Sequence, residues 1–303
     1  MIAPPRIPAR VATVRRQFDA RAPRFGERAE LLREVGRRLI ERLQYIRLAP
    51  QRILDVGCGA GETRAPLLVQ YPHADWIGVD ISERMLKAAA TEGARERAGR
   101  WLRGAASHRV AGDGGRLPIA DDSVDLLFSN LMLHWHPEPH AVFPEWKRVL
   151  KTDGLLMFSC FGPDTLKELR AAAAPALPNF RAMPFVDMHD FGDMMVASGF
   201  ATPVMDAEVI TLTYKSPQDL IREVRALGGN PRDDRAQALP SGRQARHMLS
   251  ALDAQRGEDG RIRLTFEVAF GHAWKPKPSL RGVTAITVET LRAELASRRS
   301  GKT

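Results

Sequence analysis

Three glycines at alternate positions follow a short apolar run and could hold a ligand against bare backbone. The run 53–56 predicts a buried strand that carries Asp55, and the glycines Gly57, Gly59 and Gly61 come directly after it. Without a Cβ, such residues allow a tight turn and close approach of a ligand to backbone N–H groups. A dinucleotide loop needs G-x-G-x-x-G, but Glu62 takes the last of these positions. The spacing argues against NAD or FAD, and leaves another ligand or a tight turn with no ligand.

An acidic residue ends the next predicted strand. Residues 76–80 form this strand, and Asp80 lies 19 residues after Gly61. A carboxylate at this place can accept hydrogen bonds from both hydroxyls of a ribose. The alternative is a cap for the helix that follows, but Ser82 already suits that role. We therefore expect Asp80 to bind a ribose.

A cluster of histidines near residue 134 raises the question of a metal site. The residues that could ligate a metal are His134, His136, Glu138 and His140. Pro137 and Pro139 break any helix that would align these side chains on one face. We therefore expect no metal, and we expect His134 to be a pocket wall or a substrate contact rather than a base.

Alternating strands and helices position these residues. Further strands are predicted at 108–112, 125–130 and 155–161, with helices at 27–46, 83–98 and 139–151. This alternation implies a parallel sheet with helices on both faces, which binds ligands at the carboxyl ends of its strands. The residues expected at those ends are Asp55, Asp80, Asp113, Asn130 and Phe161.

The second half of the chain is less regular. A helix is predicted from Thr165, which has the capping-box spacing to Glu168. Long strands at 209–214 and 264–274 should form an antiparallel pair that closes the sheet. The polar, helical segment between them is too long for a hairpin loop and predicts a lid. The expected organisation is an N-terminal tail and start of a covering segment at 1–26, a core at 27–215, a lid at 216–260, a closing strand at 261–275 and a basic tail at 276–303.

Composition fits a protein of 303 residues with one large domain, or one domain and a lid. The net charge of +9 comes mainly from the ends, because residues 1–18 and 276–303 carry +4 each and the remainder about +1. The basic N-terminus is expected to be a disordered tail rather than a transit peptide. Cys58 and Cys160 are placed at the ends of adjacent strands, with no metal spacing, which indicates a reduced, cytoplasmic location.

The pattern D-x-G-x-G-x-G after a strand resembles motif I of the S-adenosylmethionine-dependent methyltransferases. The resemblance implies an α/β, Rossmann-like class I fold with a mostly parallel seven-stranded sheet and a helical lid before the last strand. It also implies S-adenosyl-L-methionine as the cofactor, with Asp113 near the adenine amino group. The stretch 117–125 resembles a further motif of small-molecule methyltransferases. The expected cofactor-binding residues are Asp55, Gly57, Gly59, Gly61, Asp80, Asp113 and Asn130.

Narrower motifs resemble the malonyl-[acyl-carrier protein] O-methyltransferase family, which starts the pimeloyl branch of biotin synthesis. They lie at 17–25, 133–135, 161–170, 227–230 and 266–274, within a resemblance that covers residues 15–275. That family places an aromatic N-terminal helix over the cofactor, and Phe25 stands where some members have Tyr. The run 161–170 is shared with a methyltransferase-fold assembly factor of respiratory complex I that hydroxylates an arginine. The motif therefore marks a group of relatives and leaves the reaction open.

The resemblance implies methylation of the free carboxylate of malonyl-acyl-carrier protein. Such a carboxylate is ionised near neutral pH and needs no base, but it needs a cationic or hydrogen-bonding group to orient it. Arg170 is the candidate for this role, with an ordinary surface arginine as the alternative. Two arginine clusters could be plain exposed faces or could dock an acidic partner. They are Arg95, Arg97, Arg100, Arg103 and Arg109, and Arg222, Arg225, Arg232, Arg235, Arg243 and Arg246. The other hypotheses are a complex I assembly factor and a degenerate cofactor-binding module.

Overall fold

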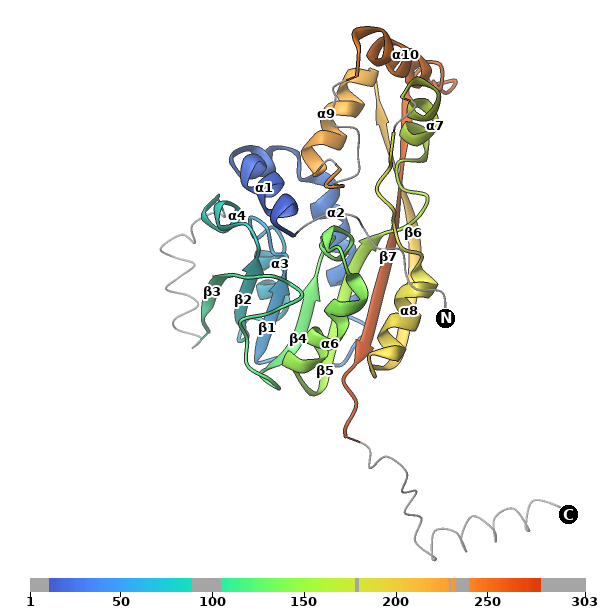
Figure 1. Cartoon of the computed structure of the whole chain (residues 1–303). Coiled ribbons are helices and arrows are strands. Elements are labelled where there is room, and N and C mark those ends of the chain that lie inside the picture. Colours follow the sequence, from blue (N-terminus) through green and yellow to red (C-terminus); the bar gives the residue numbers. More distant parts are fainter. Residues whose placement is uncertain (1–10, 89–104, 178–179, 229, 233–239, 279–303) are drawn as a thin grey trace, which may run out of the picture.

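The computed structural model describes residues 11–88, 105–177, 180–228, 230–232 and 240–278. Seven strands form one sheet in the order β3-β2-β1-β4-β5-β7-β6 (Figure 1). The first five pair in parallel, and β7 lies antiparallel between β5 and β6. The mostly parallel seven-stranded fold predicted from the sequence is confirmed. The strands are β1 (Arg52–Val56), β2 (Asp75–Asp80), β3 (Ser107–Ala111), β4 (Val124–Ser129), β5 (Leu150–Phe161), β6 (Ala201–Tyr214) and β7 (Ile262–Trp274).

Helices flank the sheet and cover its upper end in Figure 1. The elements that flank the sheet are α2 (Glu30–Leu43), α3 (Arg64–Gln70), α4 (Glu83–Ala88), α6 (Pro139–Val149) and α8 (Met188–Ala197). Those at the upper end are α1 (Val11–Arg21), η1 (Ala22–Arg28), η2 (Leu133–Trp135), α7 (Lys167–Ala176), α9 (Pro217–Leu227) and α10 (Gly242–Asp253). Within the described residues, no helix is long and apolar enough to cross a membrane.

Both faces of the sheet are buried because successive side chains of each strand point to opposite sides. On β1, Ile53 packs into the core with Val35 and Leu39 of α2. The next residue, Leu54, packs into the core on the opposite face, which includes Trp146 of α6. The central strands β1 and β4 are therefore mostly buried, whereas the edge strands β3 and β6 are more exposed.

The predicted capping box at the start of α7 was wrong. Leu166, with a positive φ of 60°, is the residue at the N-cap, and no side chain caps the helix. Thr165 and Glu168 bind β7 instead. The hydroxyl of Thr165 donates to the carbonyl oxygen of Glu267 at 3.0 Å, and the carboxylate of Glu168 accepts from the backbone N–H of Thr265 at 2.9 Å. Contacts with the distant strand β7 therefore replace the capping box that the local sequence predicts.

The placement of the two cysteines on adjacent strands was also wrong. Cys58 follows β1 and Cys160 lies on β5, with β4 between these strands. Both are buried free thiols. Strands β1 and β5 are therefore not neighbours, because β4 pairs with both of them. The predicted arginines at 95–103, Arg235 and most of the 276–303 tail lie outside the described residues.

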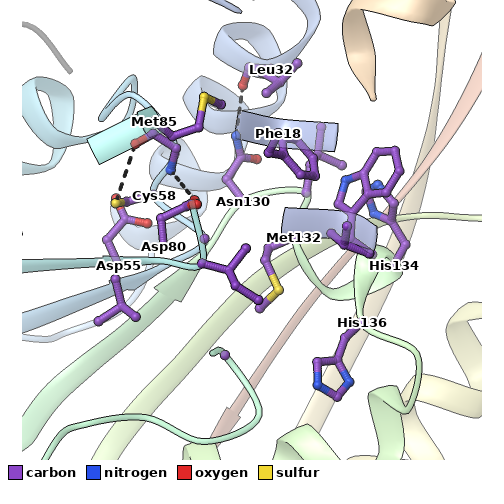
Figure 2. A pocket seen from close by; sticks show the side chains of 18 of the residues that line it. Phe18, Leu32, Asp55, Cys58, Asp80, Met85, Asn130, Met132, His134 and His136 are labelled. Carbon is purple, nitrogen blue, oxygen red and sulfur yellow. Dashed lines mark hydrogen bonds between the residues drawn. The ribbon is translucent and has the colours of Figure 1, made fainter. Parts of the chain in front are cut away.

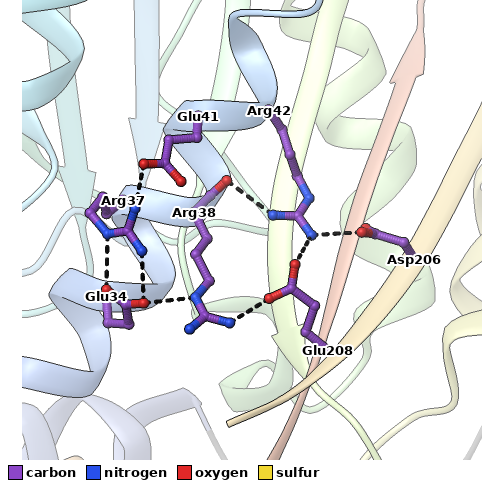
Figure 3. Close-up of polar contacts among 7 residues, drawn as sticks. All are labelled: Glu34, Arg37, Arg38, Glu41, Arg42, Asp206 and Glu208. Carbon is purple, nitrogen blue, oxygen red and sulfur yellow. Dashed lines mark hydrogen bonds and ion pairs between the residues drawn. The ribbon is translucent and has the colours of Figure 1, made fainter.

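An ionic network joins α2 to β6 on one face of the sheet (Figure 3). Arg42 pairs with Asp206 and Glu208, at 2.6 Å in each case. Its guanidinium also lies 3.7 Å from the ring centroid of Phe270. The side chain of Arg42 is only 22% exposed, so its aliphatic part packs while its charge stays paired. This contact fixes α2, which forms part of the wall of the ligand site.

We predict that Arg42→Ala lowers the free energy of unfolding by about 1–3 kcal/mol, because it removes a cation–π contact, the packing of the aliphatic part and the ion pairs with Asp206 and Glu208, of which Glu208 keeps Arg38 as a partner. Urea unfolding measures the change. Arg37→Ala is the matched control, since Arg37 also pairs with acids on α2 but its side chain is 54% exposed. Equal destabilisation by the two substitutions would contradict the role given to Arg42.

Candidate active site

The loop after β1 is anchored directly to β2. Backbone N–H groups of Gly57 and Cys58 both donate to the carbonyl oxygen of Val79, at 2.7 and 3.1 Å. Gly57, Gly59 and Gly61 all have positive φ values, of 74°, 54° and 81°. A Cβ on Gly57 would lie 2.3 Å from Cγ of Met132, so glycine is needed there for space as well as for conformation.

Asp55 lies beneath this loop rather than on its surface. The residue is 1% exposed, and its carboxylate accepts a hydrogen bond from the hydroxyl of Thr63 at 2.7 Å. Burial raises the pKa of Asp55 to about 7. The carboxyl group therefore supports the turn from inside and also forms part of the cavity wall.

Asp80 joins the loop to the end of β2 (Figure 2). Its two oxygens accept hydrogen bonds from the backbone N–H of Gly59 at 2.9 Å and of Ser82 at 2.8 Å. Burial raises the pKa of Asp80 to about 6. The side chain of Ser82 accepts from the backbone N–H of Met85 at 3.1 Å, so Ser82 caps α4 and Asp80 does not. Each carboxylate oxygen of Asp80 keeps accepting capacity for a ligand.

Asp113 and Asn130 also reach this site, with different surroundings. Asp113 accepts from the backbone N–H of Gly115 at 2.9 Å, and the nearby His136 imidazole lowers its pKa. The amide of Asn130 donates to the carbonyl oxygen of Leu32 at 2.9 Å and accepts from the hydroxyl of Ser159 at 2.8 Å. Asn130 therefore holds α2 against the end of β4, and its contact with a cofactor stays a prediction.

These residues surround one cavity of about 1060 Å³, its open mouth included, which we call the glycine-loop cavity. One side is polar, with Asp55, Asp80 and Asp113 in its wall. The other side is apolar and comes from α1 and η1, through Val14, Phe18 and Phe25. A cavity with acceptors at one side and flat apolar groups at the other suits a ribose joined to an aromatic base.

The helix α1 closes this cavity and is tied to α9. The ring of Phe18 stands edge-on to Trp135, with centroids 5.2 Å apart. Arg21 donates to the carbonyl oxygen of Arg225 at 2.9 Å, and Gln17 donates to that of Asn230 at 3.2 Å. Residues 11–26, expected to be a tail and the start of a cover, thus form a helix and a 3-10 segment. The spacing of Val14 and Phe18 is the sequence signal for the covering face of α1.

A second cavity, of about 760 Å³, lies beneath α7 and α9, and we call it the cap cavity. It shares four wall residues with the glycine-loop cavity, namely His134, Trp135, Phe161 and Leu227. The rest of its lining is mostly apolar and includes Leu166, Leu169, Phe180, Met183, Phe185 and Val224. Gly228 makes room for the shared wall, since a Cβ there would lie 2.1 Å from the ring of Trp135.

His134 lies in the wall between the two cavities and is 2% exposed. Burial lowers its pKa to about 3, so the imidazole is neutral at physiological pH. Nδ1 lies 3.7 Å from the sulfur of Cys160, and Nε2 has no hydrogen-bond partner among the described residues. The structure therefore presents a neutral imidazole with one unused nitrogen, which agrees with a wall or a substrate contact. His134 and His136 have different neighbours, and no group of three possible metal ligands occurs within the described residues.

Arg170 is the one permanently charged side chain in the described lining of the cap cavity. Its Nη2 donates to the carbonyl oxygen of Pro163, which holds one end of the guanidinium. Besides His134, two polar side chains of this lining are engaged, since Thr165 binds β7 and the amide of Asn230 binds the carbonyl oxygen of Arg181 at 2.6 Å. The predicted site residues thus fall into groups: the aspartates, Asn130, Gly57 and Gly59 line the first cavity, Arg170 lines the second, and His134 lines both. Gly61 is not among the residues that line either cavity.

We predict that Asp80→Asn weakens S-adenosylhomocysteine binding by roughly 10- to 100-fold, because a charged acceptor for ligand hydroxyls becomes an amide. Since a pKa of about 6 leaves about one carboxyl in ten ionised at pH 5, affinity should fall about tenfold between pH 7.5 and pH 5 in the original protein. This part of the pH dependence should vanish in the variant. Calorimetry at both pH values measures it, with Glu83→Gln on α4 as the control.

The chain is similar to known proteins in sequence and in fold. Residues 54–158 match the family model described as "Methyltransferase domain". A putative methyltransferase from Bacillus halodurans C-125 has the same fold, with a TM-score of 0.52 and 19% identity over 79% of this chain and 99% of that one. The [4+2]-cyclase SpnF matches with a TM-score of 0.54 and 19% identity, over 90% of this chain and all of that one. The fold alone therefore leaves the reaction open.

Relatives at higher identity narrow the family. A malonyl-[acyl-carrier protein] O-methyltransferase from Methylovorus sp. strain MP688 is 42% identical over 88% of this chain and 89% of its own length. One from Legionella pneumophila is 36% identical over 86% of this chain and 90% of its own length. The motifs quoted from the sequence had indicated the same group. The chain therefore belongs to the malonyl-[acyl-carrier protein] O-methyltransferase family, and its cofactor is S-adenosyl-L-methionine.

Proposed function

We propose that the chain methylates the free carboxylate of a malonyl thioester carried by acyl-carrier protein, as a cytoplasmic step in biotin synthesis. The observation that carries this proposal is the polarity of the cap cavity. Its described lining is largely apolar, with one cation, Arg170, and one neutral nitrogen of His134. This is the complement of an acceptor with one anionic end and an otherwise neutral chain.

The cofactor cavity fits S-adenosyl-L-methionine through groups already on the protein. Asp80 has accepting capacity for the ribose hydroxyls, the loop at 57–61 exposes backbone next to the cavity, and Phe18 and Phe25 give apolar surface. When bound, the cofactor supplies an electrophilic methyl group on a sulfonium, whose departure leaves a neutral thioether. The protein's task is then to align the two reactants across the wall that the cavities share.

Arg170 is the proposed grip on the acceptor carboxylate. With Nη2 held by Pro163, the rest of its planar fork remains to bind the carboxylate oxygens. A carboxylate is already ionised near neutral pH, so the reaction requires no proton removal. The neutral state of His134 agrees with this, because a histidine with a pKa of about 3 is a very weak base.

His134 is proposed to orient the acceptor by donating a hydrogen bond. Burial raises the pKa of the Cys160 thiol, so the sulfur keeps its proton and can donate to Nδ1 of His134. The ring proton then resides on Nε2, the atom without a partner in the wall between the cavities. A donor there would bind one oxygen of the carboxylate and leave the other free to accept the methyl group.

The hypothesis of an arginine hydroxylase or assembly factor for complex I has no specific observation in its favour here. The two relatives described above match over about nine-tenths of their own length and are named malonyl-[acyl-carrier protein] O-methyltransferases. The intact glycines and Asp80 also argue against a degenerate binding module.

We predict transfer of a tritiated methyl group from S-adenosylmethionine to malonyl-acyl-carrier protein as a base-labile ester. Absence of label above background, with S-adenosylhomocysteine binding intact, would remove the proposed function. Mass spectrometry of the carrier identifies the methyl ester independently of the radioactivity.

We also predict that Arg170→Gln lowers kcat/KM for the malonyl acceptor by roughly 10- to 100-fold, because a charge-assisted contact with the carboxylate is lost. Binding of S-adenosylhomocysteine should remain unchanged. Lys167→Gln is the matched control on the same helix, since Lys167 is half exposed and pairs only with Asp164 at 3.1 Å. Equal kinetics of the two variants would assign Arg170 to the ordinary helix surface.

A further inference from the structure

Two arginines border the cap cavity from outside. Arg181 lies between the lining residues Phe180 and Ala182, and Arg225 follows the lining residue Val224 on α9. Both side chains are exposed. Their backbones are fixed, because the carbonyl oxygen of Arg181 accepts from Asn230 at 2.6 Å and that of Arg225 accepts from Arg21 at 2.9 Å. The backbone positions of both residues are thus anchored beside the lining of the cavity, and their charged side chains face solvent.

The neighbouring helix α10 adds two more positive charges. It packs against both α7 and α9, and it carries Arg243 and Arg246 on its exposed side. The only acidic residue of α10 is its last, Asp253, which pairs with Arg256 at 2.6 Å. The four exposed arginines 181, 225, 243 and 246, which we call the rim arginines, therefore lie on segments that line the cap cavity or pack against the helices that line it.

The rim arginines differ from other arginines of the protein in their pairing. Arg42, Arg148 and Arg256 each bind a carboxylate of the chain. Within the described part of the chain, none of the rim arginines has a carboxylate within salt-bridge distance. On α9 itself, Asp219 pairs with Arg222 and Glu223 is buried, so neither neutralises Arg225. The positive charge is left for a partner.

A small acceptor has no use for this charge, because its own carboxylate would bind Arg170 inside the cavity. Several exposed cations close to a cavity instead suit a macromolecule whose acidic face surrounds an attached acyl chain. A nucleic acid fits less well, since single strands usually stack on exposed aromatic rings. In the described regions, the exposed large apolar side chains are Tyr45, Val69, Val196, Val204 and Val209, and none lies at the rim.

We propose that Arg181, Arg225, Arg243 and Arg246 form the docking surface for the acidic face of the carrier protein that delivers the acyl thioester. The proposal rests on the proposed function and extends it from the acceptor group to the body of its carrier. Docking there would place the attached chain at the mouth of the cap cavity. The rim arginines would contribute to binding of the carrier protein, whereas Arg170 would bind the reacting carboxylate.

The test compares Arg181→Gln/Arg225→Gln and Arg243→Gln/Arg246→Gln with the original protein on two acceptors. For malonyl-carrier protein, we expect KM to rise about tenfold in each double variant, with kcat within about twofold. For malonyl-N-acetylcysteamine, which lacks the carrier, both constants should stay unchanged. The control Arg47→Gln/Lys277→Gln removes two exposed charges, one before the start of β1 and one after the end of the antiparallel β7, and should leave both acceptors unaffected.

Direct binding separates failure of this proposal from failure of the proposed function. Fluorescence anisotropy of labelled carrier without the malonyl group should show weaker binding to the rim variants, and the original protein should lose affinity as salt rises. This measurement needs no methyl transfer. Unchanged carrier affinity in both rim variants would overturn the docking surface, as would an equal loss for both acceptors. A rim-dependent affinity for an RNA oligomer with none for the carrier would overturn it as well.

Discussion

The hydrogen bonds between the glycine loop and the end of β2 are the constraint on which the site depends. Two loop N–H groups share the carbonyl oxygen of Val79, and Asp80 reaches back to the N–H of Gly59. Since β1 and β2 pair in parallel register, both strands end at one level and the loop cannot shift alone. The cover is tied to the same point, because Ser82 donates to Asp19 of α1 at 2.6 Å. The glycine loop, Asp80 and the covering helix α1 thus form one mechanical unit.

Much of the sheet and of this unit could be predicted from the sequence because the signals are local. Apolar runs that end in Asp55 and Asp80 mark strand ends directly, and glycine spacing marks the loop. The failures all involve contacts between distant segments. Thr165 and Glu168 have the spacing of a cap, but β7 offers them stronger partners. The wall between the cavities also could not be foreseen, since it joins η2, β5 and α9 only in the folded chain.

Burial favours the neutral form of both the acidic groups and the histidine of the site. It raises the pKa of Asp55 and Asp80 above the usual 3.8, to about 7 and about 6, and lowers that of His134 to about 3. For a carboxyl group whose folded pKa is raised, stability is lost as pH rises from about 4 through the folded value. Ionisation of the two carboxyl groups near neutral pH therefore costs stability, and hydrogen-bond donors of a bound ligand would offset that cost at Asp80. The folded protein is thus less stable at a position where ligand binding requires an ionised carboxylate.

The shared wall has a consequence for how this protein can be altered. His134, Trp135, Phe161 and Leu227 face both cavities, so a change to any of them is felt by both reactants at once. The backbone at Gly228 lies close to the ring of Trp135, so the ring cannot move in that direction. A redesign for longer or shorter acyl chains would have to work on the far side of the cap cavity, at Phe180, Met183 and Val224. Substitutions at those positions would change acceptor preference without changing cofactor affinity. Substitutions in the shared wall must be compatible with both ligands.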